Sequence, residues 1–460
     1  MEVNKMFFYK LKWIISCIII SLPFTTSIDY LYQKYLAITL WAVMMWMFEL
    51  IPEEIVAIML PVIYLVLGIV KQDVAFNSWV SGTPWITLGG LIIGVMIVKS
   101  GLVIRIAYKA LLLAQGSLKG VIFGIVVTCT IFTPLIPSVM AKIALLVPVV
   151  IGICNVLEVK PKSRTASALI LVVFFSLWSP KMAFLTASTD SILTAGILEQ
   201  YMGIKLSWMS WAKDMFIPGI LWMICSIPLV YILKPENLSL SKEYLQNEYS
   251  KLGSVSLEEK KTILIIVCVL LAFLTASFHH IPENMIMIIF GGIAFFPKIG
   301  ILSEDDFKKI QFRVLFFLTG AVTIGDVASE IGITKLIVAF TQPYLSQMSS
   351  LELILSIYFF SILSNFLLNP LALIATLMMP MADLCKQLGY SPLVGGYSMI
   401  MGFNQALFPY EIAPLMLAYG FGYLKLSHLI KVMALRILVG IVFMVIVTYP
   451  YWSVIGLLDK

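Results

Sequence analysis

The sequence predicts an all-α, polytopic membrane protein, and three observations support this fold class. Of the 460 residues, 60% are hydrophobic and 12% are charged, whereas soluble chains carry about 25% charged residues. The mean hydropathy is +1.00. Apolar segments recur along the whole chain, and about 20 such residues span a bilayer. We therefore expect a chain that crosses the membrane many times.

The first apolar segment follows Lys5, Lys10 and Lys12 and reads WIISCIIISLPF. It is similar to a signal peptide but lacks a small-x-small cleavage site, so we expect an uncleaved helix whose N-terminus is cytoplasmic. Several of the apolar segments are too short, or too broken by Pro and Gly, to cross alone. The candidate segments are 11–28, 35–50, 54–70, 84–98, 118–133, 141–157, 166–186, 213–233, 262–278, 283–299, 313–329, 351–368, 371–388, 392–408 and 427–449.

The residue types exclude several classes of function. Lys and Arg are scattered singly, without the basic run of a nucleic-acid-binding protein. The six cysteines have no metal-ligand spacing, and the three histidines lie in or beside loops. No Ser/His/Asp set and no HExxH-type motif is present. We expect no catalytic residues, no metal site, no cofactor and no nucleic-acid partner; the lipid bilayer is the expected environment.

A single long polar stretch, 234–261, divides the chain. It contains five Lys and five Glu, so its charges cancel. We interpret it as the linker between an N-terminal half, 1–233, and a C-terminal half, 262–460.

The two halves share an order of features. The stretch Phe132–Pro148, FTPLIPSVMAKIALLVP, is broken at Pro134 and Pro137. Its counterpart LSNFLLNPLALIATLMMP closes at Pro380, 232 positions after Pro148, and the turns at Gly101 and Gly332 are 231 positions apart. Paired broken segments of this kind indicate the binding site of a secondary transporter built from a repeat. The sequence therefore predicts two hairpins, at about 118–157 and about 351–388. Chance similarity of apolar stretches is the alternative.

Flanking charges place the two hairpins on opposite sides. Residues 99–119 hold four basic residues and no acid, which indicates a cytoplasmic flank. The corresponding flank 330–352 holds Glu330, Lys335 and Glu352. Hairpins entering from opposite sides fit an inverted repeat.

These features resemble the divalent anion:sodium symporter family of the ion transporter superfamily, which carries citrate, dicarboxylates and sulfate. The matching pieces lie over most of the chain: WAVMMWMFELIPEEIVAIMLPVIYLVLGIV, GGLIIGVMIVKSGLVIRIAYKAL, STDSILTAGIL and GYLKLSHLIKVMALRILVGIVFM. The resemblance implies about 11 transmembrane helices with two re-entrant hairpins, elevator-like movement and a homodimer in the plasma (inner) membrane. It also makes Glu49 a structural residue.

The resemblance also implies where an anion and sodium would bind, namely at the hairpin tips and at two helix breaks. The family marks each tip with Ser-Asn-Thr and the first break with Thr-Pro-Pro-Asn. This chain departs from both motifs, since at the first tip only the serine is kept. The residues at these positions are Ser138, Val139 and Met140 at the first tip; Asn369, Pro370, Leu371 and Ala372 at the second; Ser188, Thr189, Asp190 and Ser191 at the first break; and Ile412, Ala413, Pro414 and Leu415 at the second.

Four ionisable residues fall in or beside these breaks: Lys142, Lys181, Asp190 and Glu411. Isolated charges in a bilayer are costly and usually pair or face a wet cavity. We hypothesise that the fixed positive charges of Lys142 and Lys181 and the protonatable carboxylates of Asp190 and Glu411 take over the role of sodium. Coupling is then to protons or to anion exchange, and Na⁺ is kept as the other coupling ion to test. In the alternative, Lys142 and Lys181 snorkel to the membrane surface and Glu411 lies at the interface.

Two transport functions stay open. The preferred one is a secondary active carrier of small organic anions, of di- or tricarboxylate type. The other is a cation/proton antiporter on the same scaffold, in which Asp190 and Glu411 would bind the cation. An enzyme is disfavoured because no catalytic set of residues is present.

Overall fold

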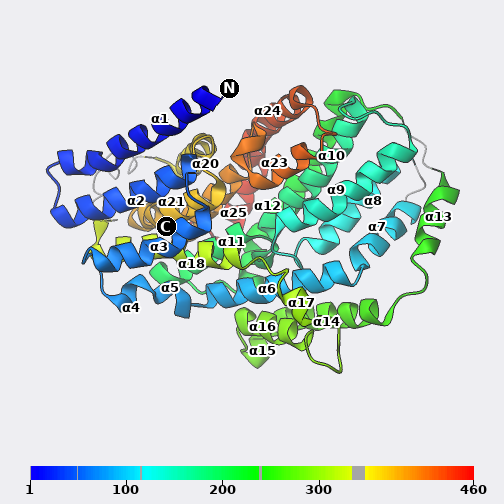
Figure 1. Cartoon of the computed structure of the whole chain (residues 1–460), viewed down its shortest axis with the longest axis horizontal. Helices are drawn as coiled ribbons and strands as arrows, with labels where there is room; N and C mark the ends of the chain where they lie inside the picture. The colour runs from blue at the N-terminus through cyan, green and yellow to red at the C-terminus, as the bar shows by residue number, and fades with distance from the viewer. Residues whose placement is uncertain (1, 49, 114–116, 238–240, 334–347, 460) are drawn as a thin grey trace.

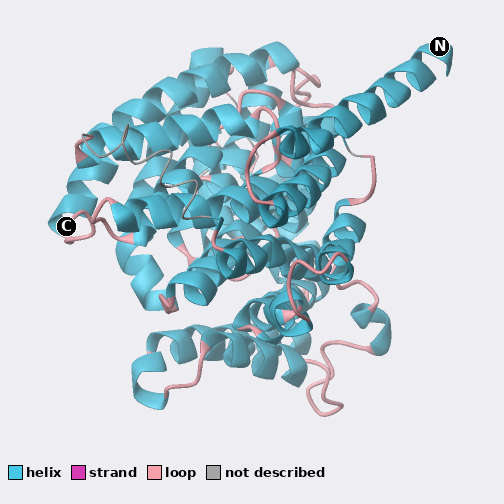
Figure 2. Ribbon diagram, turned by 90° about the vertical axis from the view of Figure 1, so that its left-hand side faces the viewer, coloured by secondary structure: helices cyan, strands magenta, loops and turns pink. Residues whose placement is uncertain are grey.

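The computed structural model describes residues 2–48, 50–113, 117–237, 241–333 and 348–459. Within these ranges all regular structure is helical and no strand occurs, as Figure 2 shows. The predicted all-α class is therefore confirmed. Glu49 and Lys335, which the sequence singled out, lie outside the described residues.

The first half of the chain forms a series of helices joined by short turns (Figure 1). Their bounds are α1 (Glu2–Ser21), α2 (Tyr30–Phe48), α3 (Glu53–Val66), α4 (Gln72–Ala75), α5 (Asn77–Val80), α6 (Gly82–Lys99), α7 (Leu102–Leu113), α8 (Leu118–Phe132), α9 (Val139–Val156), α10 (Arg164–Trp178), α11 (Thr189–Met202) and α12 (Trp208–Ser226), with the 3₁₀ turns η2 (Pro180–Ala183) and η3 (Leu185–Ala187) between α10 and α11.

The second half is likewise a series of helices. Its helices are α13 (Lys242–Lys251), α14 (Leu257–Leu274), α15 (Ala276–His279), α16 (Glu283–Ile293), α17 (Glu304–Phe307), α18 (Phe312–Ile331), α20 (Ser350–Asn365), α21 (Pro370–Gln387), α22 (Pro392–Phe403), α23 (Ala413–Gly420), α24 (Leu426–Phe443) and α25 (Tyr449–Val454), with the 3₁₀ turn η5 (Pro409–Glu411) before α23.

Six of the described helical segments are long and apolar enough to cross a membrane: Gly82–Lys99, Val139–Val156, Arg164–Ala183, Trp208–Leu233, Phe312–Ile331 and Leu426–Val454. In the segment that begins at Arg164, every residue from Thr165 to Ala183 is buried, so this segment lies in the interior of the protein. Large apolar side chains such as Leu264, Leu438 and Ile446 are exposed on the outside of other helices. Exposed apolar surface of this kind suits contact with lipid.

The stretch Phe132–Pro148 contains a break between two helices, as its prolines predict. α8 ends at Phe132 and α9 begins at Val139. Proline cannot donate a backbone hydrogen bond, so Pro134 and Pro137 interrupt the helix. Ser138 then starts α9, because its Oγ accepts the backbone N–H of Ala141 at 3.2 Å. A side-chain cap of this kind fixes the first residue of a helix.

The second hairpin forms in the same way from different residues. α20 ends at Asn365, and Asn369 caps α21 by accepting the backbone N–H of Ala372 at 2.9 Å. Figure 1 shows α8 and α9 on the right and α20 and α21 on the left, with α11, α12 and α23 between them.

Several matched details relate the two halves. Pro148 and Pro380 lie inside α9 and α21, which both have 18 residues. Gly101 and Gly332 end α6 and α18 with the same φ of +77°, a left-handed conformation that favours glycine. The spacing seen in the sequence thus corresponds to equivalent positions in the two hairpins and turns.

The polar stretch 234–261 contains α13 and the start of α14. Arg105 of α7 holds it in place. The guanidinium donates to Glu259 at 2.5 Å and to the backbone carbonyls of residues 252–254. The part of the stretch from residue 252 to Glu259 is therefore attached to the first half of the chain.

Candidate functional site

A cavity of about 220 Å³ lies where the two hairpins meet the two broken helices. We call it the central cavity. Its lining combines hairpin tips, helix breaks and the starts of two further helices. It is formed by Ser138, Val139 and Met140; Trp178 and Lys181; Ser188, Thr189 and Asp190; Asn369, Pro370 and Leu371; Ile412, Ala413 and Pro414; Gln311, Arg313, Val314 and Phe317; and Glu53.

The lining residues have a common property: most belong to the first turn of a helix. Ser138, Ser188, Asn369 and Ile412 are the N-cap residues of α9, α11, α21 and α23. The backbone N–H groups of a first turn have no partner within the helix, and the helix dipole adds about half a positive charge there. Four such ends surround one cavity, so its backbone favours an anion.

Two more helices begin at the same cavity. Gln311 precedes α18, and Glu53 is the first residue of α3. Arg313 lies in the first turn of α18, exposed to the cavity, and forms no hydrogen bond or ion pair with any residue of the described ranges. A guanidinium without a partner is available to a carboxylate ligand.

Lys181 and Asp190 form an ion pair in the wall of the cavity. The ammonium of Lys181 also lies over the ring of Trp178, 3.1 Å from its centroid. Asp190 occupies the first turn of α11, where a negative charge is favoured. The pair joins the two parts of the first broken helix and leaves little net charge there.

Lys142 lies behind the first hairpin tip rather than in the cavity wall. Its side chain is only 1% exposed. Nζ donates to the carbonyl of Thr133 at 3.3 Å and to that of Ala187 at 3.1 Å. Thr133 directly follows the last residue of α8, and Ala187 precedes the N-cap residue of α11. The ammonium therefore occupies a position between carbonyls of the hairpin tip and of the first break.

Glu411 plays the corresponding structural part at the second break. It is buried, and its carboxylate accepts the backbone N–H groups of Leu407 and Phe408 at 3.0 and 2.7 Å. Asn365 donates to it at 3.5 Å. The carboxylate thus closes the turn before α23 by hydrogen bonds to its own loop.

The cavity brings together most of the site residues named from the sequence. Lining it are Ser138, Val139, Met140, Lys181, Thr189, Asp190, Asn369, Pro370, Ala413 and Pro414. Lys142, Ser191 and Glu411 are buried beside it and do not line it. The alternative in which Lys142 and Lys181 snorkel to the surface, with Glu411 at an interface, does not match the structure, because all three are buried.

The sequence interpretation missed Arg313, Gln311 and Trp178. Gln311 lies just before the apolar segment 313–329 and Arg313 begins it, and a polar or charged residue at such a place is typical of an ordinary membrane boundary. Trp178 lies within an apolar run. The available signal was the break in the helix that follows Trp178, since residues at the end of a half-helix approach the same gap.

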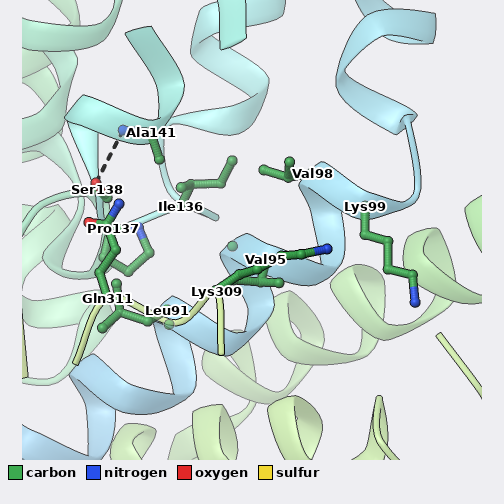
Figure 3. A pocket seen from close by; sticks show the side chains of 12 residues that line it. Leu91, Val95, Val98, Lys99, Ile136, Pro137, Ser138, Ala141, Lys309 and Gln311 are labelled. Atoms are coloured by element: carbon green, nitrogen blue, oxygen red, sulfur yellow. Dashed lines mark hydrogen bonds between the residues drawn. The ribbon is translucent and has the colours of Figure 1, made fainter. Parts of the chain in front are cut away.

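A second, more apolar cavity of about 250 Å³ adjoins the first, and we call it the side cavity (Figure 3). It lies between α6 and the first hairpin tip, and it shares Ser138 and Gln311 with the central cavity. Lys99 and Lys309 line it, and both pair with Asp306. We take the central cavity as the candidate site because the capped helix starts converge there.

Asp306 lies in the loop between α16 and α18, outside the membrane-spanning segments. Its carboxylate accepts from Lys309 at 2.8 Å and from Lys99 at 2.6 Å, and it also caps α17 through Ser303. Hydrogen bonds from Lys309, then Lys99, hold the pKa of Asp306 well below its usual range.

Comparisons with known proteins agree with this architecture. The family described as "Sodium:sulfate symporter transmembrane region" matches residues 4–458. The L-tartrate/succinate antiporter of Escherichia coli (strain K12) is 23% identical over 84% of this chain and 81% of its own length. The putative malate transporter YflS of Bacillus subtilis (strain 168) is 22% identical over 62% of this chain and 61% of its own length.

Other relatives match over shorter regions. Dicarboxylate transporter 1, chloroplastic, of Spinacia oleracea is 28% identical over 43% of this chain. The chain spans 36% of the length of that relative, and 61% of the length of the "Membrane protein" of Cupriavidus necator.

Solved structures show the same fold at low identity. The YdaH transporter of Alcanivorax borkumensis aligns over 84% of this chain and 88% of its own, with a TM-score of 0.55 and 14% identity. Neisseria gonorrhoeae MtrF aligns over 84% of both chains, also with a TM-score of 0.55. Since the matching family covers nearly all of the chain, the resemblance seen in the sequence is confirmed. The chain belongs to the sodium:sulfate symporter family and is a multi-pass integral membrane protein.

Proposed function

We propose that this chain is a secondary active carrier of small dicarboxylates, which bind in the central cavity. The observation that carries the proposal is the convergence of four capped or Pro-led helix starts on this one space. Each start offers a partial positive charge to a carboxylate, and the starts of α9 and α11, which lack proline, also offer backbone N–H groups. The matches to proteins named as malate, dicarboxylate and tartrate/succinate transporters support the same substrate class.

The size of the cavity favours a small ligand. Its volume is about 220 Å³, while pockets for drug-sized molecules usually measure about 300–1,000 Å³. One carboxylate would lie against the N–H groups at the starts of α9 and α11. The second would lie near α21 and α23, with Arg313 offering a pair of N–H donors.

Transport would not use sodium at the first break, because the Lys142 ammonium already lies between the carbonyls of Thr133 and Ala187. Carbonyls at an unwound helix are the usual ligands of a coupling Na⁺ in such carriers. A fixed positive charge there supports an exchanger or a proton-coupled carrier. Of the relatives above, one is named as an antiporter.

The proposed membrane topology, elevator-like movement and homodimer rest on the repeat that relates the two halves of the chain. The hairpins α8–α9 and α20–α21 would be re-entrant, entering from opposite sides of the inner membrane with the N-terminus in the cytoplasm. Together with the broken helices they would form a moving, elevator-like unit, and the chain would function as a homodimer. The matched prolines and glycines of the two halves support the inverted repeat.

A cation/proton antiporter receives less support. It would need Asp190 or Glu411 to be free for a cation. Asp190 is paired with Lys181, and Glu411 accepts hydrogen bonds from its own loop. Within the described residues, no group of three His, Cys, Asp or Glu side chains could hold a metal ion.

Ligand-induced stabilisation tests the proposal. The purified protein would be heated with succinate, malate, tartrate, sulfate or acetate, each with sodium or with choline as the only cation. A ligand that binds only the native state raises the melting temperature. We expect stabilisation by dicarboxylates in both salts and none by acetate. No dicarboxylate effect in either salt would contradict the proposed substrate class.

A further inference from the structure

A second buried cation, Arg436 of α24, lies where the two broken helices cross. Its side chain is 0% exposed. Its five hydrogen bonds all go to uncharged acceptors: Asn404 O at 2.6 Å, Asn404 Oδ1 at 2.5 Å, Gln405 Oε1 at 3.1 Å, Ser179 Oγ at 3.0 Å and Ser226 Oγ at 3.3 Å.

None of the ion pairs in the described part of the chain includes Arg436. The rings of Trp222 and Phe175 lie 4.8 and 5.2 Å from its guanidinium carbon. A charge this deep costs several kcal/mol unless something nearby is negative. The surroundings must therefore supply negative potential from a source other than a carboxylate.

The source is the pair of helix ends at this point. α10 ends at Trp178 and is followed by Ser179, and α22 ends at Phe403 and is followed by Asn404. The last carbonyls of a helix carry about half a negative charge. Arg436 binds the residue after each helix, so its guanidinium lies between two negative ends.

These two ends are also tied to each other. Nε1 of Trp178 donates to the carbonyl of Asn404 at 2.9 Å, and Nδ2 of Asn404 donates to the carbonyl of Trp178 at 2.9 Å. Trp178 itself lines the central cavity. Arg436 is thus one residue removed from the cavity, and it holds both broken helices through the same contact.

Resting on the function proposed above, we infer that Arg436 is a positioning residue that serves as a permanent internal cation for the two broken helices. It neutralises the ends of α10 and α22. The starts of α11 and α23 then stay directed at the cavity without a metal ion. Half-helix C-terminal ends in such carriers can hold Na⁺. Here the guanidinium takes that role at the crossing, as Lys142 does at the first hairpin.

The test separates the effect of the positive charge of Arg436 from the effect of the space that its side chain fills. Arg436→Ala removes the guanidinium, and Arg436→Lys keeps the charge. Lys431→Ala, on the exposed side of the same helix, is the matched control. Succinate exchange is measured in proteoliposomes, and melting temperature in detergent. Low millimolar guanidinium is added to each variant, with urea as a neutral molecule of the same shape.

We expect Arg436→Ala to lose exchange by about tenfold or more, which corresponds to about 1.4 kcal/mol. Guanidinium should restore part of that exchange and raise the melting temperature of this variant, whereas urea should do neither. Arg436→Lys should keep more exchange than Arg436→Ala, and Lys431→Ala should behave like the wild type. Wild-type exchange within twofold in Arg436→Ala, or a loss that neither guanidinium nor Arg436→Lys relieves, would overturn the inference.

If Arg436→Ala does not fold, Gln405→Glu decides between the outcomes, because Oε1 of Gln405 already accepts from the guanidinium at 3.1 Å. The new carboxylate would pair with the guanidinium and cancel its charge while keeping the packing. We expect unchanged or higher thermal stability with exchange reduced by about fivefold or more; unreduced exchange would overturn the inference. A wild-type protein that exchanges no dicarboxylate would instead refute the proposed function. The melting temperature of Arg436→Ala with guanidinium would still decide the role of Arg436.

Discussion

At the scale of single residues, the proposed transport without sodium depends on where positively charged side chains are buried. Lys142 and Arg436 both point their charge at carbonyls near the ends of broken helices, and both are buried. Neither has a carboxylate partner in the described part of the chain. A buried charge kept without a salt bridge is weak evidence for stability, so a functional role is the better explanation.

Replacing Lys142 with Met should separate stability from transport. The apolar side chain has a similar length and removes a costly buried charge, so the melting temperature should stay the same or rise. Exchange should fall by about tenfold or more, since the carbonyls of Thr133 and Ala187 lose their cation. Both quantities are measured on purified, reconstituted protein.

Lys119→Met is the control, because Lys119 is exposed on α8 of the same hairpin. It should leave exchange unchanged. Normal exchange by Lys142→Met would show that the ammonium at the first break has no part in transport.

The residue scale also shows where sequence reasoning reached its limit. Ser138 and Asn369 could be identified because the resemblance to the family places its tip motif at a fixed distance before Pro148 and Pro380. Arg436 could not, because the acceptors it binds lie 31 to 257 positions away in the chain. A single Arg in an apolar run has the same local pattern whether it is buried at a crossing or reaches the membrane surface.

At the scale of helices, the essential elements are the capped helix starts. Ser138 and Ser117 are both N-caps of the first hairpin, with cap hydrogen bonds of 3.2 Å each. Only Ser138 lines the central cavity. The two caps therefore offer a matched comparison of helix stability with ligand binding.

Ser138→Ala and Ser117→Ala should each lower the free energy of unfolding by about 1 kcal/mol, the usual loss for an N-cap. Only Ser138→Ala should also raise the KM for succinate, since it disturbs a helix start at the cavity. Thermal unfolding and initial rates of uptake measure the two effects. An equal change of KM in both variants would show that the cap acts through general stability alone.

Asp306 ties the loop before α18 to α6, and its contribution should depend on pH. Because its pKa in the folded protein is lowered, its stabilising effect is present above the ordinary Asp pKa of about 3.9 and is lost as pH falls below it. Asp306→Asn should therefore lower the free energy of unfolding by about 1–3 kcal/mol near neutral pH.

The difference between Asp306→Asn and the wild type should shrink in acid. Asp305→Asn is the neighbouring control, because Asp305 forms only an exposed pair with Lys308 and such pairs contribute about 0–1 kcal/mol. The free energy of unfolding of both variants and of the wild type, measured from neutral pH to acidic pH, checks these two expectations. A difference for Asp306→Asn that stays constant over that range would contradict the assigned role.

At the scale of the whole molecule, composition was enough to predict an all-helical membrane protein, and the resemblance of four sequence segments predicted its family. The central cavity was predictable in part: its hairpin and break residues were named from the sequence. The lining residues that come from α3 and α18 could not be predicted. The sequence around Glu53 or Arg313 does not indicate which other helix starts these residues approach in the fold.

The central claim is that dicarboxylates are carried without sodium, because fixed cations already occupy the ends of the broken helices. The most direct test is succinate counterflow in proteoliposomes, measured with sodium and then with choline as the only cation on both sides. The account predicts accumulation of labelled succinate at similar rates in both salts. Accumulation that strictly requires sodium would contradict it.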